Sequence, residues 1–131
     1  MIKMDTEISR EMYRENILYL YKNPRNFGIL KDASHEKKEV NPLCGDEITV
    51  QIKVEGGRIA DVRYTAKGCA ISIASASLLT DYIKGKKVQE VLAMNTEDIL
   101  SLLEIPIGPV RLKCALICLK AIQKALSEGK K

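Results

Sequence analysis

Two alternating runs on either side of a glycine pair constrain the fold more than any other feature of the sequence. The first run has apolar side chains at Ile48, Val50, Ile52 and Val54. The second has them at Ala60, Val62, Tyr64 and Ala66. A period of two residues is that of a half-buried strand. Because Gly56-Gly57 supplies the positive φ angles of a tight turn, the two runs are predicted to form an antiparallel hairpin.

Two cysteines flank this predicted hairpin. Cys44 comes just before the first strand and Cys69 just after the second. Antiparallel pairing folds the two outer ends of a hairpin back to the same edge, so we expect the two thiols to lie near each other. Gly45 lets the backbone turn between Cys44 and Asp46, so that a thiolate and a carboxylate can face one centre.

Four helical segments and one short strand account for most of the remaining chain. Residues 5–22 form a loosely amphipathic pattern that ends at Asn23-Pro24. A charged strand around residues 35–40 would suit a sheet edge, although His35 itself is expected to be a solvated loop residue. Short helices are predicted around residues 88–94 and over residues 96–104, the second capped by Asn95. The helix after Cys69 has its apolar face at Ile71, Leu78, Leu79, Tyr82 and Ile83.

The last helix is predicted from Pro109 to about Ser127. Its core stripe consists of Leu112, Ala115, Leu119, Ile122 and Leu126, and its solvent face of Lys113, Lys120 and Lys124. Cys114 and Cys118 fall on the flank between the two faces. Together the elements predict an α+β chain that forms a single domain over residues 1–131, with disordered tails at residues 1–4 and 128–131.

Composition narrows the class of protein. The chain has 131 residues, a net charge of +4, one Phe and no Trp. Its scattered lysines and few aromatic side chains argue against nucleic-acid binding. No apolar run is long enough for a membrane span and the first ten residues lack a signal-peptide pattern, so we expect no membrane partner and a cytoplasmic location. Thiols stay reduced there, so the four cysteines are expected to be ligands, nucleophiles or packed thiols rather than disulfides.

Three of the cysteines have surroundings that favour the reactive thiolate. Cys69 is expected in the first turn of a helix, and Cys114 follows the cationic Lys113. With Cys44 and Asp46 they make a site of three thiolates and one harder carboxylate, which suits a metal cluster that can leave. Cys118 has no motif around it and is interpreted as a packed thiol. Each cysteine taken alone could also be packing, and Asp46 alone could be a turn former.

Four blocks of sequence resemble a known family. They are "YRENILYLYKNPRNFG", "NPLCGDEITVQIKV", "GCAISIASAS" and "PVRLKCALICLKAI". Their order and spacing are similar to those of the U-type iron-sulfur cluster assembly scaffolds, which include the IscU and SufU proteins and the N-terminal part of NifU. The resemblance implies a small three-stranded antiparallel sheet with helices packed on one face. It also implies that Cys44, Cys69 and Cys114 hold the cluster or accept sulfur, Cys114 being the acceptor, and that Asp46 keeps the cluster labile.

The function that the resemblance implies is assembly of a transient [2Fe-2S] cluster. A cysteine desulfurase would supply the sulfur, and apo iron-sulfur proteins would receive the cluster, so the chain would be a scaffold rather than an enzyme. Zinc at the same residues is the alternative, either in a SufU-like zinc-dependent sulfurtransferase or in a structural zinc domain. Lys113 stands where IscU proteins have His and is typical of SufU-like members, yet the SufU insertion between the second and third cysteines is missing. Residues 107–111, "IGPVR", only partly match the Hsp70-binding loop of IscU, which leaves an Hsp70-type chaperone open as a partner.

Overall fold

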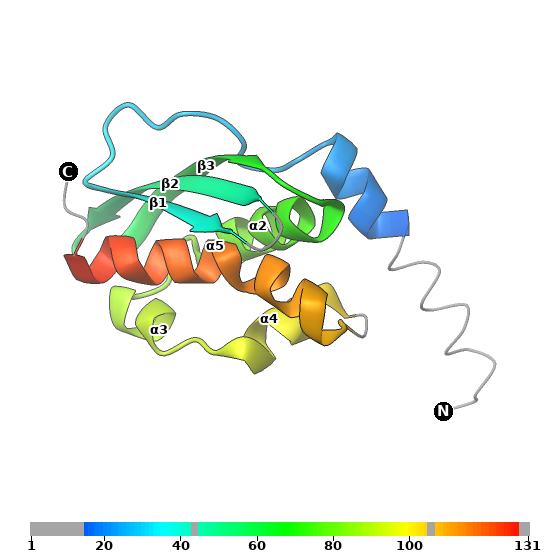
Figure 1. Cartoon of the computed structure of the whole chain (residues 1–131). Coiled ribbons are helices and arrows are strands. Elements are labelled where there is room, and N and C mark those ends of the chain that lie inside the picture. Colours follow the sequence, from blue (N-terminus) through cyan, green and yellow to red (C-terminus); the bar gives the residue numbers. More distant parts are fainter. Residues whose placement is uncertain (1–14, 43–44, 105–106, 129–131) are drawn as a thin grey trace.

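The computed structural model describes residues 15–42, 45–104 and 107–128, and they form a three-stranded sheet covered by helices (Figure 1). The strands β1 (His35–Asn41), β2 (Asp46–Glu55) and β3 (Arg58–Lys67) lie in the order β1-β2-β3. Both neighbouring pairs are antiparallel. Gly56 and Gly57 turn the hairpin with φ angles of 58° and 75°. The hairpin and the charged edge strand are therefore confirmed.

The central strand and β3 provide the apolar face of the sheet. Their fully buried side chains are Ile48, Val50, Ile52, Ile59, Val62 and Tyr64. On this same face β1 is polar, because Lys37 and Glu39 reach the end of the last helix and pair with Glu128 and Lys124. His35 belongs to β1, is half-buried and lies with its Nδ1 2.9 Å from the Ser34 hydroxyl. The expectation of a solvated loop histidine was wrong, since pairing with Ile52 in β2 extends the edge strand to this residue.

The helices gather on one face of the sheet, as the resemblance implied (Figure 1). The helices α2 (Ala70–Ile83) and α5 (Pro109–Glu128) pack directly against the strands. Below them lie α3 (Val88–Leu92) and α4 (Thr96–Leu103), the latter capped by the Asn95 side chain, which accepts a hydrogen bond from the Asp98 backbone N–H. In α5 the predicted core stripe is turned inward, and Lys113, Lys120 and Lys124 are exposed.

The buried face of α2 differs from the predicted one. Tyr82 was expected in the core but is 47% exposed, with the Lys86 ammonium 4.3 Å from its ring centroid. Small residues take the inner positions instead: Ser72, Ala74, Ser75, Ala76, Ser77 and Thr80 are all buried. Their hydroxyls find partners on neighbouring elements, as when Ser77 meets the Tyr64 phenol at 2.8 Å. Small polar side chains thus allow α2 to lie close to both the sheet and α5.

The segment before β1 covers the outer edge of the sheet. A helix occupies residues 15–22 and ends before Asn23-Pro24 as predicted, while its expected beginning at residue 5 lies outside the described residues. Gly28 donates its backbone N–H to Tyr64 of β3, and Tyr64 donates to Asn26. The exposed edge of β3 is thereby paired. Among the described helices none combines the length and apolar character needed to cross a membrane.

Candidate metal centre

Asp46 opens strand β2 beside the turn that leads from β1. The turn is closed by a hydrogen bond of 2.8 Å from the Gly45 backbone N–H to the Asn41 carbonyl. Gly45, which was expected to let the backbone turn, has a positive φ of 72°. Asp46 is only 4% exposed. Its neighbour Cys44 lies outside the described residues, so its place in the site stays a prediction. Asp46, two residues after Cys44, nevertheless directs its buried carboxylate toward the helices.

Cys69 is the N-cap residue of α2, with the extended φ and ψ of −75° and 171° that caps adopt. Its sulfur accepts no capping hydrogen bond of ordinary geometry. Burial raises the pKa of Cys69, but the backbone and hydroxyl of Ser72, the Cys114 thiol and the Ile71 backbone more than offset it and leave the pKa below its usual 9.0. A half-buried cysteine at a helix N-terminus therefore favours its thiolate, as the sequence indicated.

Cys114 lies in the second turn of α5 and is 1% exposed. The next residue is tied to α2, because the Ser75 hydroxyl donates a hydrogen bond of 2.6 Å to the Ala115 carbonyl. Arg111, one turn before Cys114, carries a guanidinium that interacts with both sulfurs. A hydrogen bond to Cys69 and the charge of its thiolate raise the pKa of Arg111. Arg111 is thus a cation next to the thiols, where the sequence suggested Lys113. Its position three residues before Cys114 could have indicated this contact, because residues three apart are neighbours on a helix.

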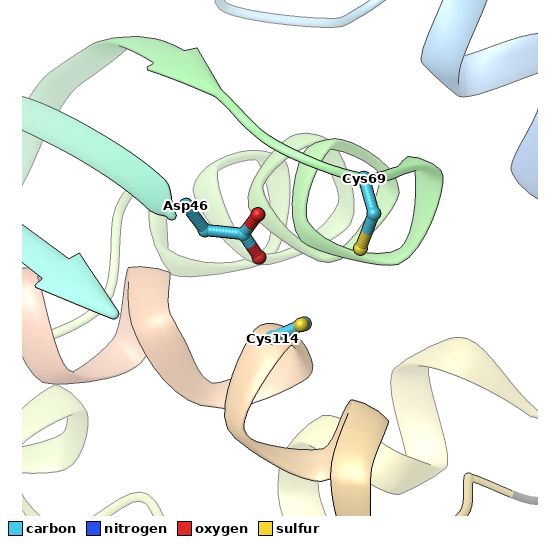
Figure 2. Close-up of side chains that lie close together, drawn as sticks. All are labelled: Asp46, Cys69 and Cys114. Atoms are coloured by element: carbon cyan, nitrogen blue, oxygen red, sulfur yellow. The ribbon is translucent and has the colours of Figure 1, made fainter. Parts of the chain in front are cut away.

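These three side chains converge on one point from three different elements, as Figure 2 shows. One carboxylate oxygen of Asp46 and the sulfurs of Cys69 and Cys114 all lie within 4.8 Å of one another. Two sulfurs bound to one tetrahedral metal lie about 3.8 Å apart, given a metal-sulfur bond of about 2.3 Å. The two sulfurs are soft donors and the carboxylate oxygen is a hard one, and both zinc and iron-sulfur centres accept such a mixed set of ligands. Their spacing requires only a small contraction, so the residues present fit such a metal.

Ser72 and Gly68 surround the Asp46 carboxylate. The Ser72 hydroxyl donates a hydrogen bond of 2.6 Å to Oδ2 of Asp46 and also lies 3.6 Å from the Cys69 sulfur. A Cβ atom added to Gly68 would meet Cγ and Oδ1 of Asp46 at 3.1 Å. A side chain at position 68 would therefore crowd the carboxylate. Ser72 lies in one of the four blocks of the sequence that resemble the family, but its hydrogen bond to Asp46 could be found only from the structure.

Comparison with known proteins agrees with this geometry. Residues 12–131 match the family model described as NifU-like N terminal domain. The chain belongs to this NifU-like N-terminal family. The resemblance stated from the sequence is thereby confirmed, and so is the fold it implied.

Relatives of this NifU-like chain include an IscU protein and a SufU protein. The chain is 39% identical to the iron-sulfur cluster assembly enzyme IscU of Drosophila melanogaster, over 91% of this chain and 79% of that protein. It is 35% identical to the zinc-dependent sulfurtransferase SufU of Bacillus subtilis, over 89% and 90% of the two chains. The crystal structure of a SufU-type scaffold protein from Fervidobacterium islandicum superposes with a TM-score of 0.76 at 29% identity, covering 86% of this chain and 95% of that one.

Two further residues singled out in the sequence of this NifU-like chain, Cys118 and Lys113, differ in their burial. Cys118 is fully buried in the core, where burial raises its pKa, so its interpretation as a packed thiol agrees with the structure. Lys113 is exposed, and its auxiliary role at the metal stays a prediction. It lines a shallow cavity of about 170 Å³ together with Glu39, Val40, Asn41, Pro42, Ile117 and Lys120.

Proposed function

We propose that this protein is an iron-sulfur cluster assembly scaffold. It accepts sulfur from a cysteine desulfurase, builds a transient [2Fe-2S] cluster on Cys44, Asp46, Cys69 and Cys114, and passes the cluster to apo-proteins. The observation that carries the proposal is the convergence of Asp46, Cys69 and Cys114 within 4.8 Å. The IscU and SufU names of its relatives support the same assignment.

The ligand set accounts for a cluster that is held and then released. Thiolates bind iron strongly, whereas a carboxylate is a harder and poorer partner for an iron-sulfur centre. Four thiolates would hold a cluster permanently. Here the fourth ligand is the Asp46 carboxylate, which binds iron more weakly than a thiolate does. Cluster transfer to an acceptor would begin where the Asp46 carboxylate binds the iron. The protein therefore acts as a carrier of the cluster, which is its cargo.

Sulfur arrives, in this proposal, at Cys114. Its thiolate would attack the outer sulfur of the desulfurase persulfide, forming a new S–S bond while the desulfurase cysteine leaves as a thiolate. Because Cys114 is 1% exposed and Cys69 is half-buried, the donor would approach from the side of Cys69. The exposed Arg111, which interacts with both sulfurs, lies at this entrance and would stabilise the thiolate charges.

A second candidate function is that of a zinc-dependent sulfurtransferase. The 35% identity to SufU of Bacillus subtilis and the lysine at position 113 favour it. In that case zinc on the same four residues would hold a thiolate until it accepts persulfide sulfur. The two candidate functions use the same four ligands and the same sulfur source, a cysteine desulfurase. They differ in the metal that the site retains while sulfur is supplied.

The test is anaerobic reconstitution in which the two metals compete. The purified protein receives equal amounts of Fe²⁺ and Zn²⁺ together with a cysteine desulfurase, cysteine and a thiol reductant, which supplies the electrons that convert persulfide sulfur to sulfide. Bound iron, sulfide and zinc are then measured. A scaffold is expected to acquire iron and sulfide in equal amounts and the visible absorption of a [2Fe-2S] cluster. Retention of zinc with persulfide on a cysteine, and no acid-labile sulfide, would establish the sulfurtransferase instead.

A further inference from the structure

Ser72 connects two of the candidate ligands that come from different elements. It lies on α2, three residues after Cys69, and its hydroxyl reaches across to the first residue of β2. The oxygen is 2.6 Å from Oδ2 of Asp46 and 3.6 Å from the sulfur of Cys69. The hydroxyl therefore lies within reach of both candidate ligands and is hydrogen-bonded to the carboxylate.

We propose that Ser72 is a positioning residue for the metal centre, which holds the Asp46 carboxylate in the orientation that faces Cys69 and Cys114. The inference rests on the proposed function, because it assumes that these side chains bind the metal. Carboxylates that bind metals are in general oriented by hydrogen bonds of their own, and loss of such a partner typically weakens metal binding about 10- to 100-fold.

Tight packing supports this role. Ser72 is 3% exposed and Asp46 4% exposed, so their hydrogen bond is shielded from competing water. On the side of Gly68 the carboxylate is closely approached by the backbone, since a Cβ atom there would lie 3.1 Å from it, and this limits the directions in which the carboxylate can turn. Removal of the Ser72 hydroxyl would open space next to Oδ2 and free the carboxylate to rotate. The hydroxyl thus fixes an orientation that the close approach of Gly68 alone leaves open.

The other buried serines of α2 form hydrogen bonds away from the metal centre. Ser75 donates to the Ala115 carbonyl and ties α2 to α5, whereas Ser77 bonds the Tyr64 phenol in the core. Ser77 is fully buried, and neither of its hydrogen-bond partners, the Tyr64 phenol and the Arg25 backbone N–H, is a candidate ligand. It therefore provides a matched control. If Ser72 served packing alone, Ser72→Ala and Ser77→Ala would affect the protein in the same way.

The experiment measures binding of Co²⁺ alone, a spectroscopic substitute for zinc, and Zn²⁺ affinity by competition with a chelator. For Ser72→Ala we expect about 10- to 100-fold weaker binding and an altered visible Co²⁺ spectrum. Ser72→Thr, which keeps the hydroxyl, should restore both, and Ser77→Ala should leave both unchanged. In an Asp46→Ala background, Ser72→Ala should change the affinity by less than about twofold, because the two residues act as one unit.

Two results would overturn the inference. One is a wild-type Co²⁺ spectrum and affinity in Ser72→Ala. The other is an equal loss in the presence and absence of Asp46, which would show that Ser72 acts through the fold rather than through the carboxylate. The test stays valid if Ser72→Ala lowers stability, since the same serine change is made with and without Asp46, and a loss caused by lower stability would appear in both backgrounds. Failure of the wild-type protein to bind Co²⁺ through its thiolates would be a distinct outcome, and it would overturn the proposed function together with this inference.

Discussion

Serine substitutions at Cys114 and Cys118 test the assignment of the site most sharply among single changes. The two cysteines are one turn apart on α5 and almost equally buried, at 1% and 0% exposure. Of the two, Cys114 belongs with Asp46 and Cys69 to the group of described residues whose ligand atoms lie within 4.8 Å of one another, and Cys118 does not. Burial raises the pKa of Cys118, so it stays a neutral thiol that does not bind iron. The same chemical change should therefore have different consequences one turn apart.

The expected magnitudes follow from the surroundings of each sulfur. Cys118→Ser places a hydroxyl in an apolar core, which should lower the free energy of unfolding by about 1–3 kcal/mol. The cluster content of the folded protein should stay near the wild-type value. Cys114→Ser removes one of three thiolates and should abolish the cluster, with a smaller effect on the stability of the metal-free protein, since its hydroxyl would face the polar groups of the site.

Two measurements separate these effects. Urea unfolding of the metal-free variants gives the free energy of unfolding, and iron and sulfide per folded protein after reconstitution give the cluster content. Cys118→Ala, which removes the sulfur without adding a hydroxyl, is the matched control and should keep its cluster. Equal loss of cluster from Cys114→Ser and Cys118→Ser would refute the assignment of Cys118 to packing.

Three further predictions concern the neighbours of the thiols. Asp46→Ala should retain its [2Fe-2S] cluster longer and donate it more slowly, as followed by visible absorbance, because the harder ligand at which cluster release begins is gone, whereas a single Co²⁺ ion loses a ligand and binds more weakly. Faster decay of the cluster would make Asp46 a stabilising ligand of the cluster. In the metal-free protein, alkylation of Cys69 should reach half its maximal rate below pH 9.0, since its pKa is lowered, and Arg111→Ala should move that midpoint upward. A midpoint at or above 9.0 in the wild type would contradict this. Gly68→Ala should push the carboxylate by a few tenths of an ångström and weaken Co²⁺ binding; unchanged binding would show that the carboxylate can yield.

The parts of the fold with strong periodicity could be predicted from the sequence. Alternation and a glycine pair predicted β2, β3 and their antiparallel pairing, and the 3.6-residue stripe of α5 identified its buried face. At the hairpin end of β3 the predicted alternation was wrong, because the register shifts at Lys53/Val54 and Ile59 is buried in place of Ala60. The approach of Asp46 to Cys69 followed from hairpin geometry. In each case a local pattern had one structural solution, because a shift would expose apolar side chains.

Features that depend on partners from distant segments could not be predicted in this way. The inner face of α2 consists of serines and alanines, which carry little hydrophobic signal, so Tyr82 was wrongly placed in the core. Ser72 became a candidate for function only when its bond to Asp46, 26 residues earlier, was known. Lys113, adjacent to Cys114 in sequence, lines a cavity together with Asn41 and Pro42, whereas Arg111, one turn away, interacts with the sulfurs. Helical geometry favours neighbours three and four residues apart over adjacent ones.

Transfer of a preformed cluster to an apo-ferredoxin tests the central claim most directly. The reconstituted protein is mixed anaerobically with the acceptor in the presence of a strong iron chelator, and the ferredoxin cluster is counted by its circular dichroism. The account predicts nearly complete transfer that the chelator does not intercept, and slower transfer from Asp46→Ala. Loss of all iron to the chelator with no holo-ferredoxin formed would contradict a scaffold that hands its cluster on.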